Sequence, residues 1–253
     1  MTFNDHFSRV SGHYARHRPR YPAALFDWLA TAAARHGLVW DCATGSGQAA
    51  VGLADRFDRV VATDASADQL RHATSDPRIE YRVADAGSSG LDDRSVDLVT
   101  CAQAVHWLPR EAFFAEARRV LAPDGLIAVW GYHVAATGDD AIDRAIRHFH
   151  DVVVGPYWPP ERRLVLDRLM TIDFPFDEVA APAFEIRCQW SLDDFAQYLG
   201  TQSATDRYRQ AHGADPVPAF VAEVAGPWAS RPVRDVTFPV FVRAGCIRPT
   251  VGP

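Results

Sequence analysis

Two aspartates and two glycines in this chain have the spacing of a pocket for an adenosine-bearing cofactor. Asp41 ends a strand-like run, and Gly45 and Gly47 follow it within a few residues. Asp64 closes the next strand-like run. Glycine has no Cβ, so the backbone can turn tightly there and approach a ligand closely. A carboxylate in the position of Asp64 can accept hydrogen bonds from both hydroxyls of a ribose.

Asp41 distinguishes between two cofactors that such a pocket can hold. The run from Gly45 to Ala50 satisfies the loose glycine pattern of dinucleotide-binding enzymes, so NAD is one candidate. The Asp41 carboxylate would repel a diphosphate placed over this turn. The methionine half of S-adenosylmethionine carries an ammonium and a sulfonium, whose positive charge the same carboxylate would offset. Asp41 therefore favours S-adenosylmethionine, although an aspartate here can also serve only to cap the turn.

In this region the chain resembles the class I S-adenosylmethionine-dependent methyltransferases. Four segments match the motifs of that family in order, namely 41–47, Asp64, 83–86 and 119–125. Ala43 departs from the family pattern because it stands where a first glycine is usual. The resemblance implies an enzyme with a Rossmann-like fold that uses S-adenosylmethionine as its cofactor.

The resemblance also implies which residues bind the cofactor. Asp64 would bind the ribose and Asp85 the adenine amino group. Arg18 would pair with the cofactor's carboxylate, while Tyr14 would lie over the sulfonium or close the site. Gln103 and Ala104 follow the fourth predicted strand, which places them beside the methionine portion. The complete set of predicted cofactor-binding residues is Tyr14, Arg18, Asp41, Ala43, Gly45, Gly47, Asp64, Asp85, Gln103 and Ala104.

A narrower resemblance links the chain to the branch that contains trans-aconitate methyltransferase. It rests on the segments 14–22, 104–107, 129–132, 155–158 and 192–199. The resemblance implies a small-molecule acceptor with carboxylate groups, and the residues predicted to contact it are Tyr21, Trp107, Tyr157 and Trp158. Gln202 departs from this branch, in which a tryptophan is usual. If that tryptophan shapes the acceptor pocket, the acceptor of this chain differs.

The class of acceptor decides whether the reaction needs a general base. An ionised carboxylate is nucleophilic and needs none, and arginines would position its remaining anionic groups. A hydroxyl or carbon acceptor, as in methyltransferases of secondary metabolism, would need a base, for which His106 and His133 are the candidates. The sequence leaves this choice open. It predicts no metal site, because no complete set of ligands accompanies the histidines.

The order of elements predicts an α/β fold with a Rossmann-like, doubly wound, seven-stranded and mostly parallel sheet. Five strands are expected near 38–42, 60–63, 79–83, 96–102 and 126–130, alternating with helices. A helical cap is expected after the fifth strand. We expect one methyltransferase domain over 1–253, with a lid at 1–36, a cofactor-binding core at 37–131, a cap and substrate region at 132–178 and 191–232, and the last two strands at 179–190 and 233–247.

Composition narrows the classes of function. With 253 residues, of which 48% are hydrophobic and 23% charged, the chain can form one large domain around a buried sheet. A net charge of −6 disfavours a nucleic-acid partner. The absence of a signal core and of an apolar run of about 18 residues predicts a cytoplasmic protein without a membrane partner. Four widely spaced cysteines predict buried thiols rather than a disulfide pair.

Two functions from other classes stay open at this point. A nicotinamide-dependent oxidoreductase would also use the glycine turn, and a protein could bind the cofactor without catalysis. The sequence does not indicate an oligomeric state.

Overall fold

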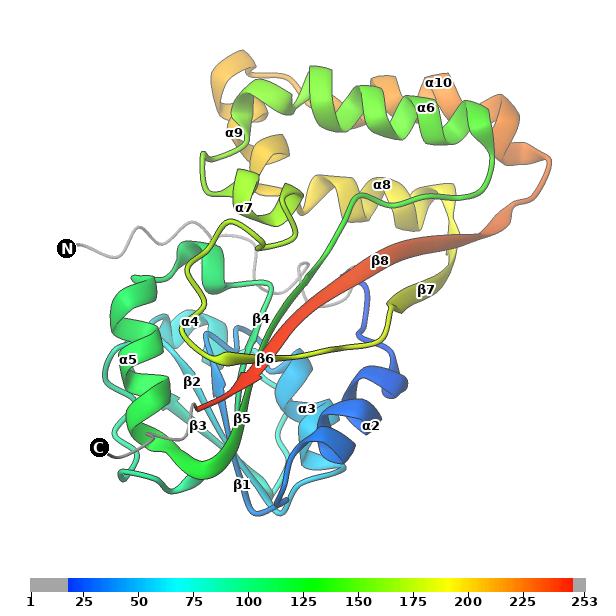
Figure 1. Cartoon of the computed structure of the whole chain (residues 1–253). Coiled ribbons are helices and arrows are strands. Elements are labelled where there is room, and N and C mark those ends of the chain that lie inside the picture. Colours follow the sequence, from blue (N-terminus) through cyan, green and yellow to red (C-terminus); the bar gives the residue numbers. More distant parts are fainter. Residues whose placement is uncertain (1–17, 248–253) are drawn as a thin grey trace.

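Parallel strands form the half of the sheet that carries the glycine turn. The computed structural model describes residues 18–247. Its strands are β1 (Leu38–Cys42), β2 (Arg59–Asp64), β3 (Ile79–Val83), β4 (Val96–Ala102), β5 (Leu121–Tyr132), β6 (Asp177–Val179), β7 (Phe184–Ser191) and β8 (Val233–Cys246). The order across the sheet is β3-β2-β1-β4-β5-β8-β6, with β7 paired to β8 (Figure 1). Neighbours from β3 to β5 all run parallel, which confirms the predicted doubly wound sheet.

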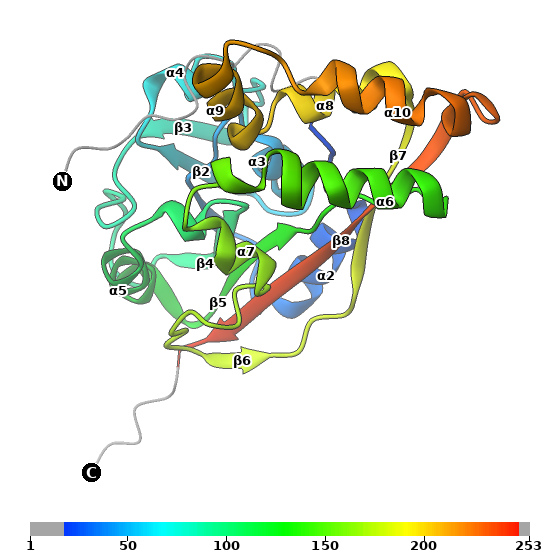
Figure 2. The ribbon, with the colours of Figure 1, turned by 90° about the horizontal axis from the view of Figure 1, so that it is seen from above.

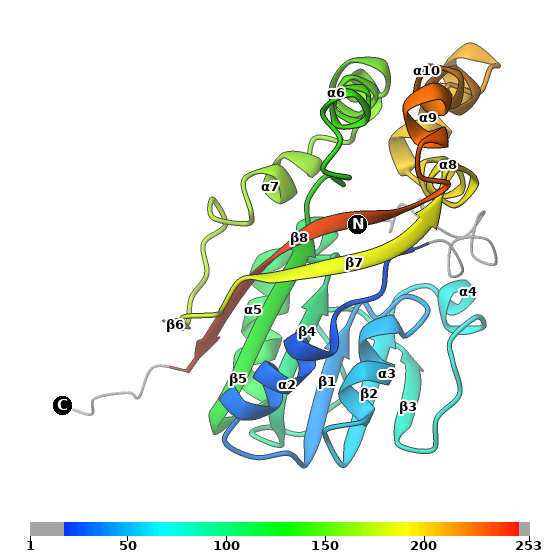
Figure 3. The ribbon, with the colours of Figure 1, turned by 90° about the vertical axis from the view of Figure 1, so that its right-hand side faces the viewer.

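The parallel strands are buried on both faces because helices cover both sides of the sheet. These helices are α2 (Ala23–Ala32), α3 (Gln48–Ala54), α4 (Ala67–Leu70), the 3-10 helix η2 (Val105–Trp107) and α5 (Arg110–Val120). Successive side chains of a strand point to opposite faces. Val39 accordingly packs in the core with α2 and α3, and its neighbour Trp40 packs in the core with α5. Figure 3 shows α2 and α3 on one side of the sheet and α5 on the other.

The long strand β8 organises the antiparallel half of the sheet. It runs antiparallel to β5, with Leu126 opposite Cys246 and Tyr132 opposite Val240. On its other edge β8 pairs with β6 near its end and with β7 along its first part. The sheet therefore has eight strands rather than the predicted seven. The strand expected within 179–190 is β7, and the structure adds the short strand β6 before it; Pro182 between them has no N–H to donate to a sheet.

A helical cap covers the carboxyl edge of the parallel strands. Its elements are α6 (Asp140–His148), the π-helical turn η3 (Phe149–Val153), the 3-10 helix η4 (Gly155–Tyr157), α7 (Arg162–Leu166), α8 (Leu192–Gly200), α9 (Ser203–His212) and α10 (Val217–Ala229). The first four follow β5, and the last three connect β7 to β8 (Figures 1 and 2). The two inserts meet where α6 packs on α10, with Phe149 and Phe220 in edge contact.

The described residues show neither a membrane-spanning helix nor a metal cluster. Within residues 18–247, no helix combines the length and the apolar composition that crossing a bilayer requires. The same residues contain no group of three or more histidine, cysteine, aspartate or glutamate side chains arranged to hold a metal ion. The four cysteines all lie in strands as free thiols.

The close contact between α3 and α2 predicts an unusual effect of alanine at Gly52. A Cβ built on Gly52 would lie 2.4 Å from the Phe26 ring, which is itself buried. Glycine to alanine normally stabilises a helix interior by about 0.5–1 kcal/mol. Here we expect Gly52→Ala to lower the free energy of unfolding by about 1–3 kcal/mol, measured by urea titration, because the added methyl overpacks the contact. In a Phe26→Leu background the same change should be neutral or stabilising. A stabilised Gly52→Ala single variant would show that the contact is loose.

Candidate functional site

The predicted cofactor residues meet at the carboxyl edge of the parallel strands. Asp41 is the penultimate residue of β1, Asp64 ends β2, and Gln103 directly follows β4. Because β2, β1 and β4 are parallel neighbours, these three positions lie side by side. Figure 2 shows the cap helices over these strands. Asp85 follows β3 at the same edge, where it is exposed. The edge therefore brings together residues that are more than 60 positions apart in the chain.

Asp41 is buried and holds the turn after β1. One carboxylate oxygen accepts a hydrogen bond from the Thr44 hydroxyl at 2.5 Å, and the other accepts one from the Thr100 hydroxyl at 2.7 Å. Burial raises the pKa of Asp41 to about 6, although the two hydroxyl donors act in the opposite direction. The bond to Thr44 is the turn-capping role considered above. An added role of Asp41 toward a cationic ligand stays a prediction.

The turn itself requires a backbone that favours glycine. Gly45 and Gly47 have φ values of 58° and 80°, and Ala43 has a φ of 54°. The left-handed region costs a residue with a Cβ about 1–2 kcal/mol. Ala43, which stands where the family usually has a glycine, therefore adopts a backbone conformation that favours glycine. Thr44 N–H donates to the Thr63 carbonyl at 3.0 Å, which ties the turn to β2.

Asp64 is fixed at the end of β2 by backbone donors. One carboxylate oxygen accepts from Gly45 N–H at 2.9 Å and the other from Ser66 N–H at 2.8 Å. Ser66 in turn caps α4, because its hydroxyl accepts from Gln69 N–H. The turn after β1 and the start of α4 thus hold the same carboxylate. This geometry preorganises Asp64 for the ribose contact that the sequence predicts.

Gln103 links the ends of β4 and β5. Its backbone is in the left-handed region, with a φ of 53°. Its N–H donates to the Trp130 carbonyl at 2.7 Å, and its side-chain oxygen accepts from Tyr132 N–H at 3.0 Å. A Cβ on Gly131 would lie 2.4 Å from that oxygen, so glycine is needed there. The structure therefore gives Gln103 a positioning role, and Ala104 leads directly into η2.

Arg18 reaches from the start of the described chain to the cap. Its guanidinium donates to the Tyr132 hydroxyl at 2.9 Å and to the Thr201 carbonyl at 3.0 Å. It thereby joins the end of β5 to the segment that follows α8. Its predicted pairing with the cofactor's carboxylate stays a prediction. Tyr14 lies outside the described residues.

The two histidines proposed as bases both have a lowered pKa. Burial lowers the pKa of His106 to about 3, and the nearby cations Arg162 and Arg110 lower it further. Burial also lowers the pKa of His133, whose Nε2 donates to the Leu166 carbonyl at 3.2 Å. With a pKa of about 3, His106 takes up a proton poorly at neutral pH.

The residues predicted to contact the acceptor have different surroundings. Tyr21 packs edge-on against Trp130 at the end of β5. Trp107 lies against His106, with ring centroids 4.8 Å apart. Trp158 supports the cap, because its indole N–H donates to the His150 carbonyl at 3.1 Å. Tyr157 contacts His212 through its hydroxyl and Tyr208 through its ring.

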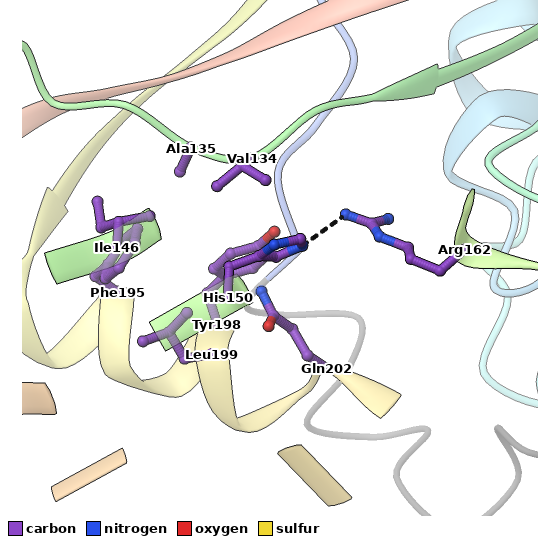
Figure 4. A pocket seen from close by; sticks show the side chains of 9 residues that line it. All are labelled: Val134, Ala135, Ile146, His150, Arg162, Phe195, Tyr198, Leu199 and Gln202. Atoms are coloured by element: carbon purple, nitrogen blue, oxygen red, sulfur yellow. Dashed lines mark hydrogen bonds between the residues drawn. The ribbon is translucent and has the colours of Figure 1, made fainter. Parts of the chain in front are cut away.

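Between the two cap inserts lies a small cavity of about 10 Å³ that the sequence did not indicate. Its lining residues are Val134, Ala135, Ile146, His150, Arg162, Phe195, Tyr198, Leu199 and Gln202 (Figure 4). The Arg162 guanidinium stacks over the Trp158 ring at 4.6 Å and lies 3.4 Å from His150 Nε2. Two features of the sequence pointed to this region: the resemblance of segment 155–158 to the trans-aconitate methyltransferase branch, and the departure from that branch at Gln202.

Arg162 is a cation without an acidic partner among the residues that the structure describes. Its Nε is buried without a hydrogen-bond partner. The groups that act on its pKa are the Tyr198 and Tyr132 hydroxyls and the like-charged Arg18, and burial is the largest influence and lowers the pKa. Within residues 18–247, the cap thus presents a positive charge without an acidic partner above the strand ends, where Asp41 and Asp64 are negative.

The buried carboxyl of Asp41 predicts a pH dependence of stability. Its pKa of about 6 in the folded protein exceeds the ordinary 3.8. Between these values the folded chain binds more protons than the unfolded chain, so this group lowers the free energy of unfolding as pH rises. The full contribution is about 3 kcal/mol. In urea titrations without cofactor, the free energy of unfolding of Asp41→Asn minus that of the wild type should increase by this amount from pH 4 to pH 7. A constant difference would contradict the raised pKa.

Comparisons with known proteins agree with this geometry. A family model described as a methyltransferase domain matches residues 40–129. The solved structure called "Putative Type II Methyltransferase" from Anaeromyxobacter dehalogenans is 41% identical, with a TM-score of 0.86, and the match covers 92% of this chain and 99% of that chain. A Dictyostelium discoideum protein named as a putative methyltransferase is 28% identical, over 95% of this chain and 94% of its own length.

A shorter match is also to a methyltransferase. An uncharacterised methyltransferase of Mycobacterium tuberculosis is 40% identical over 128 residues, and the match spans about half of each chain, 49% of this one and 51% of the relative. The matched family model covers the glycine turn, Asp64 and Asp85, which the structure places along one edge of the sheet. The chain therefore belongs to the class I S-adenosylmethionine-dependent methyltransferases.

Proposed function

We propose that this enzyme transfers the methyl group of S-adenosylmethionine to a carboxylate of a small organic acid. The family and the fold imply S-adenosylmethionine as the methyl donor. The observation that carries the choice of acceptor is Arg162, a cation under the cap with no acidic partner among residues 18–247. The trans-aconitate-like acceptor suggested by the sequence is one member of this class.

The residues at the strand ends fit the cofactor. Gly45 and Gly47 provide left-handed backbone that permits a close approach, and the Asp64 carboxylate is already fixed by two backbone donors. Asp64 would hold the ribose, and Asp85 would hold the adenine amino group. When bound, S-adenosylmethionine supplies a methyl group that its positively charged sulfur has already activated.

Arg162 fits a carboxylate for physical reasons. Removing a charge from water is costly unless an opposite charge or hydrogen bonds compensate it. A guanidinium offers a planar pair of donors that matches the two oxygens of a carboxylate. An acid whose carboxylate contacts the guanidinium would therefore offset the cost of burying Arg162. Stacking on Trp158 keeps the guanidinium plane in one orientation for this contact.

The lowered pKa of His106 supports the same choice. A carboxylate is ionised at neutral pH and is nucleophilic without help, so the formation of a methyl ester moves no proton. A hydroxyl acceptor would have to lose a proton to a base. His106, with a pKa of about 3, is a poor base for that task. The site is therefore better suited to an acceptor that arrives already ionised.

Replacing Arg162 tests the acceptor class. We expect Arg162→Leu to lower kcat/KM for the acids that the wild type methylates by about 100-fold, because the carboxylate loses two charge-assisted hydrogen bonds. Arg162→Lys should lose less, since it keeps the charge without the planar fork. The control is Arg163→Leu, because the Arg163 side chain is 86% exposed. All three variants should bind S-adenosylhomocysteine with wild-type affinity in calorimetry. Wild-type kcat/KM in Arg162→Leu would refute the role.

Replacing Asp64 tests the cofactor site separately. Asp64→Ala should weaken the binding of S-adenosylhomocysteine by about 100-fold, because the ribose would lose a bidentate, charged acceptor. Asp64→Asn keeps one acceptor oxygen and should show an intermediate affinity. Thermal unfolding of each variant checks that the turn after β1 is intact. Unchanged affinity in a folded Asp64→Ala variant would mean that the ribose lies elsewhere.

A further inference from the structure

Side chains of the insert that follows β5 hold the Arg162 guanidinium in place. Its plane stacks over the Trp158 ring at 4.6 Å, and its Nη2 lies 3.4 Å from His150 Nε2 (Figure 4). The His150 and Trp158 rings also lie against each other, with centroids 5.0 Å apart. On the far side of the imidazole, His150 Nδ1 lies 2.7 Å from a carboxylate oxygen of Asp151. A chain of polar contacts therefore runs from Asp151 through His150 to Arg162.

The two polar neighbours of the His150 ring determine which nitrogen carries its proton. A guanidinium only donates hydrogen bonds, so His150 Nε2 must be the acceptor toward Arg162. An ionised carboxylate only accepts, so Nδ1 must carry the proton and donate to Asp151. The other neutral tautomer would turn an N–H toward the Arg162 donor and a lone pair toward the Asp151 carboxylate. Only the tautomer with its proton on Nδ1 satisfies both contacts.

The surroundings of His150 also favour an uncharged ring. The residue is 5% exposed, and burial is the largest influence on its pKa and lowers it. The cation Arg162 and the nearby His133 lower the pKa as well, whereas Asp151 acts in the opposite direction. Tyr198 lines the same cavity and stays protonated, because burial raises its pKa. A neutral imidazole with an accepting Nε2 therefore faces Arg162.

We propose that His150 is a positioning residue for the methyl acceptor: it accepts a hydrogen bond from Arg162 and so orients the guanidinium, and Asp151 keeps His150 in the tautomer that can accept. This inference rests on the proposed function, because it assumes that Arg162 binds the acceptor's carboxylate. Neither His150 nor Asp151 then has to touch the acceptor. A guanidinium that is already held in one orientation loses less freedom when a ligand binds, which strengthens binding.

Asp151 offers the mildest test, because its side chain is 65% exposed and its removal leaves the core packed. We expect Asp151→Ala to raise KM for the methylated acids by about tenfold with little change in kcat, because His150 is then free to turn an N–H toward Arg162. Asp151→Asn keeps an oxygen that accepts from Nδ1–H and should keep KM near the wild-type value. A KM raised as much by Asp151→Asn as by Asp151→Ala would overturn the tautomer's role.

Variants of His150 itself test the same contact from the other side. His150→Leu offers no acceptor to Arg162 and should raise KM at least as much as Asp151→Ala does. His150→Gln carries an oxygen at a reach similar to that of Nε2 and should recover most of the loss. Equal losses in the two variants would overturn the proposal.

Glu161→Ala is the matched control for the change in charge. Glu161 directly precedes Arg162, is exposed, and makes no capping bond with α7. This variant also removes one negative charge near Arg162, but it leaves the His150 ring untouched and should keep the wild-type KM. If Glu161→Ala raised KM as much as Asp151→Ala, loss of charge alone would explain the effect and the proposal would fall. Calorimetric binding of S-adenosylhomocysteine shows that each variant is folded.

A double variant distinguishes orientation of Arg162 from general support of the fold. In an Arg162→Leu background, Asp151→Ala should cause no further loss of kcat/KM for the acids, because the guanidinium that it positions is absent. If the two losses simply multiplied, Asp151 would act independently of Arg162 and the proposal would be wrong.

The tautomer itself can be observed without any acceptor. Nuclear magnetic resonance of isotope-labelled histidine shows which ring nitrogen carries the proton, and the His150 signal is the one missing in His150→Gln. We expect the proton on Nδ1 in the wild type, and a shift toward Nε2 in Asp151→Ala. A proton on Nε2 in the wild type would overturn the role of His150 and leave the carboxylate acceptor standing. If a wild-type protein that binds S-adenosylhomocysteine methylated no acid, both proposals would fall.

Discussion

Opposite charges held out of water at one edge of the sheet are the constraint on which the rest of the structure depends. Asp41 is fully buried with two hydroxyl partners, and Arg162 lies beneath the cap with no acidic partner among residues 18–247. Each charge is costly unless a ligand compensates it. A cationic sulfonium near Asp41 and an anionic acceptor near Arg162 would compensate both. The arrangement of charges therefore matches the two substrates of the proposed reaction.

The cofactor half of the site could be predicted because its signals are local. Asp41 and Asp64 each end an apolar run, and parallel strands with such runs bring their carboxyl ends together. The number of strands, eight rather than seven, was harder to predict from the sequence. The three residues of β6 before Pro182 are too few to show a strand pattern, and only their pairing with β8 makes them a strand separate from β7. The conformation of Ala43, which suits glycine, agrees with the departure seen in the sequence.

The sequence predicted that both inserts form the substrate region, but not which residues of the proposed acceptor half meet there. Arg162 and His150 follow β5, whereas Tyr198 and Gln202 precede β8. No spacing in the sequence relates these residues. Trp158 was predicted as a substrate residue because segment 155–158 resembles a known branch of the family. In the structure its ring stacks against the Arg162 guanidinium. The sequence alone could not show that His106 is buried. Burial lowers its pKa, which disfavours the predicted role of general base.

The chemical nature of the methylated product tests the central claim most directly. The enzyme is incubated with S-adenosylmethionine carrying a labelled methyl group and a panel of small carboxylic acids, and the product is then treated with mild base. A methyl ester releases its label as volatile methanol, whereas methyl groups bound to ether oxygen, nitrogen or carbon stay in the product. The account predicts a base-labile label on an acid. A base-stable label would contradict the carboxylate as acceptor.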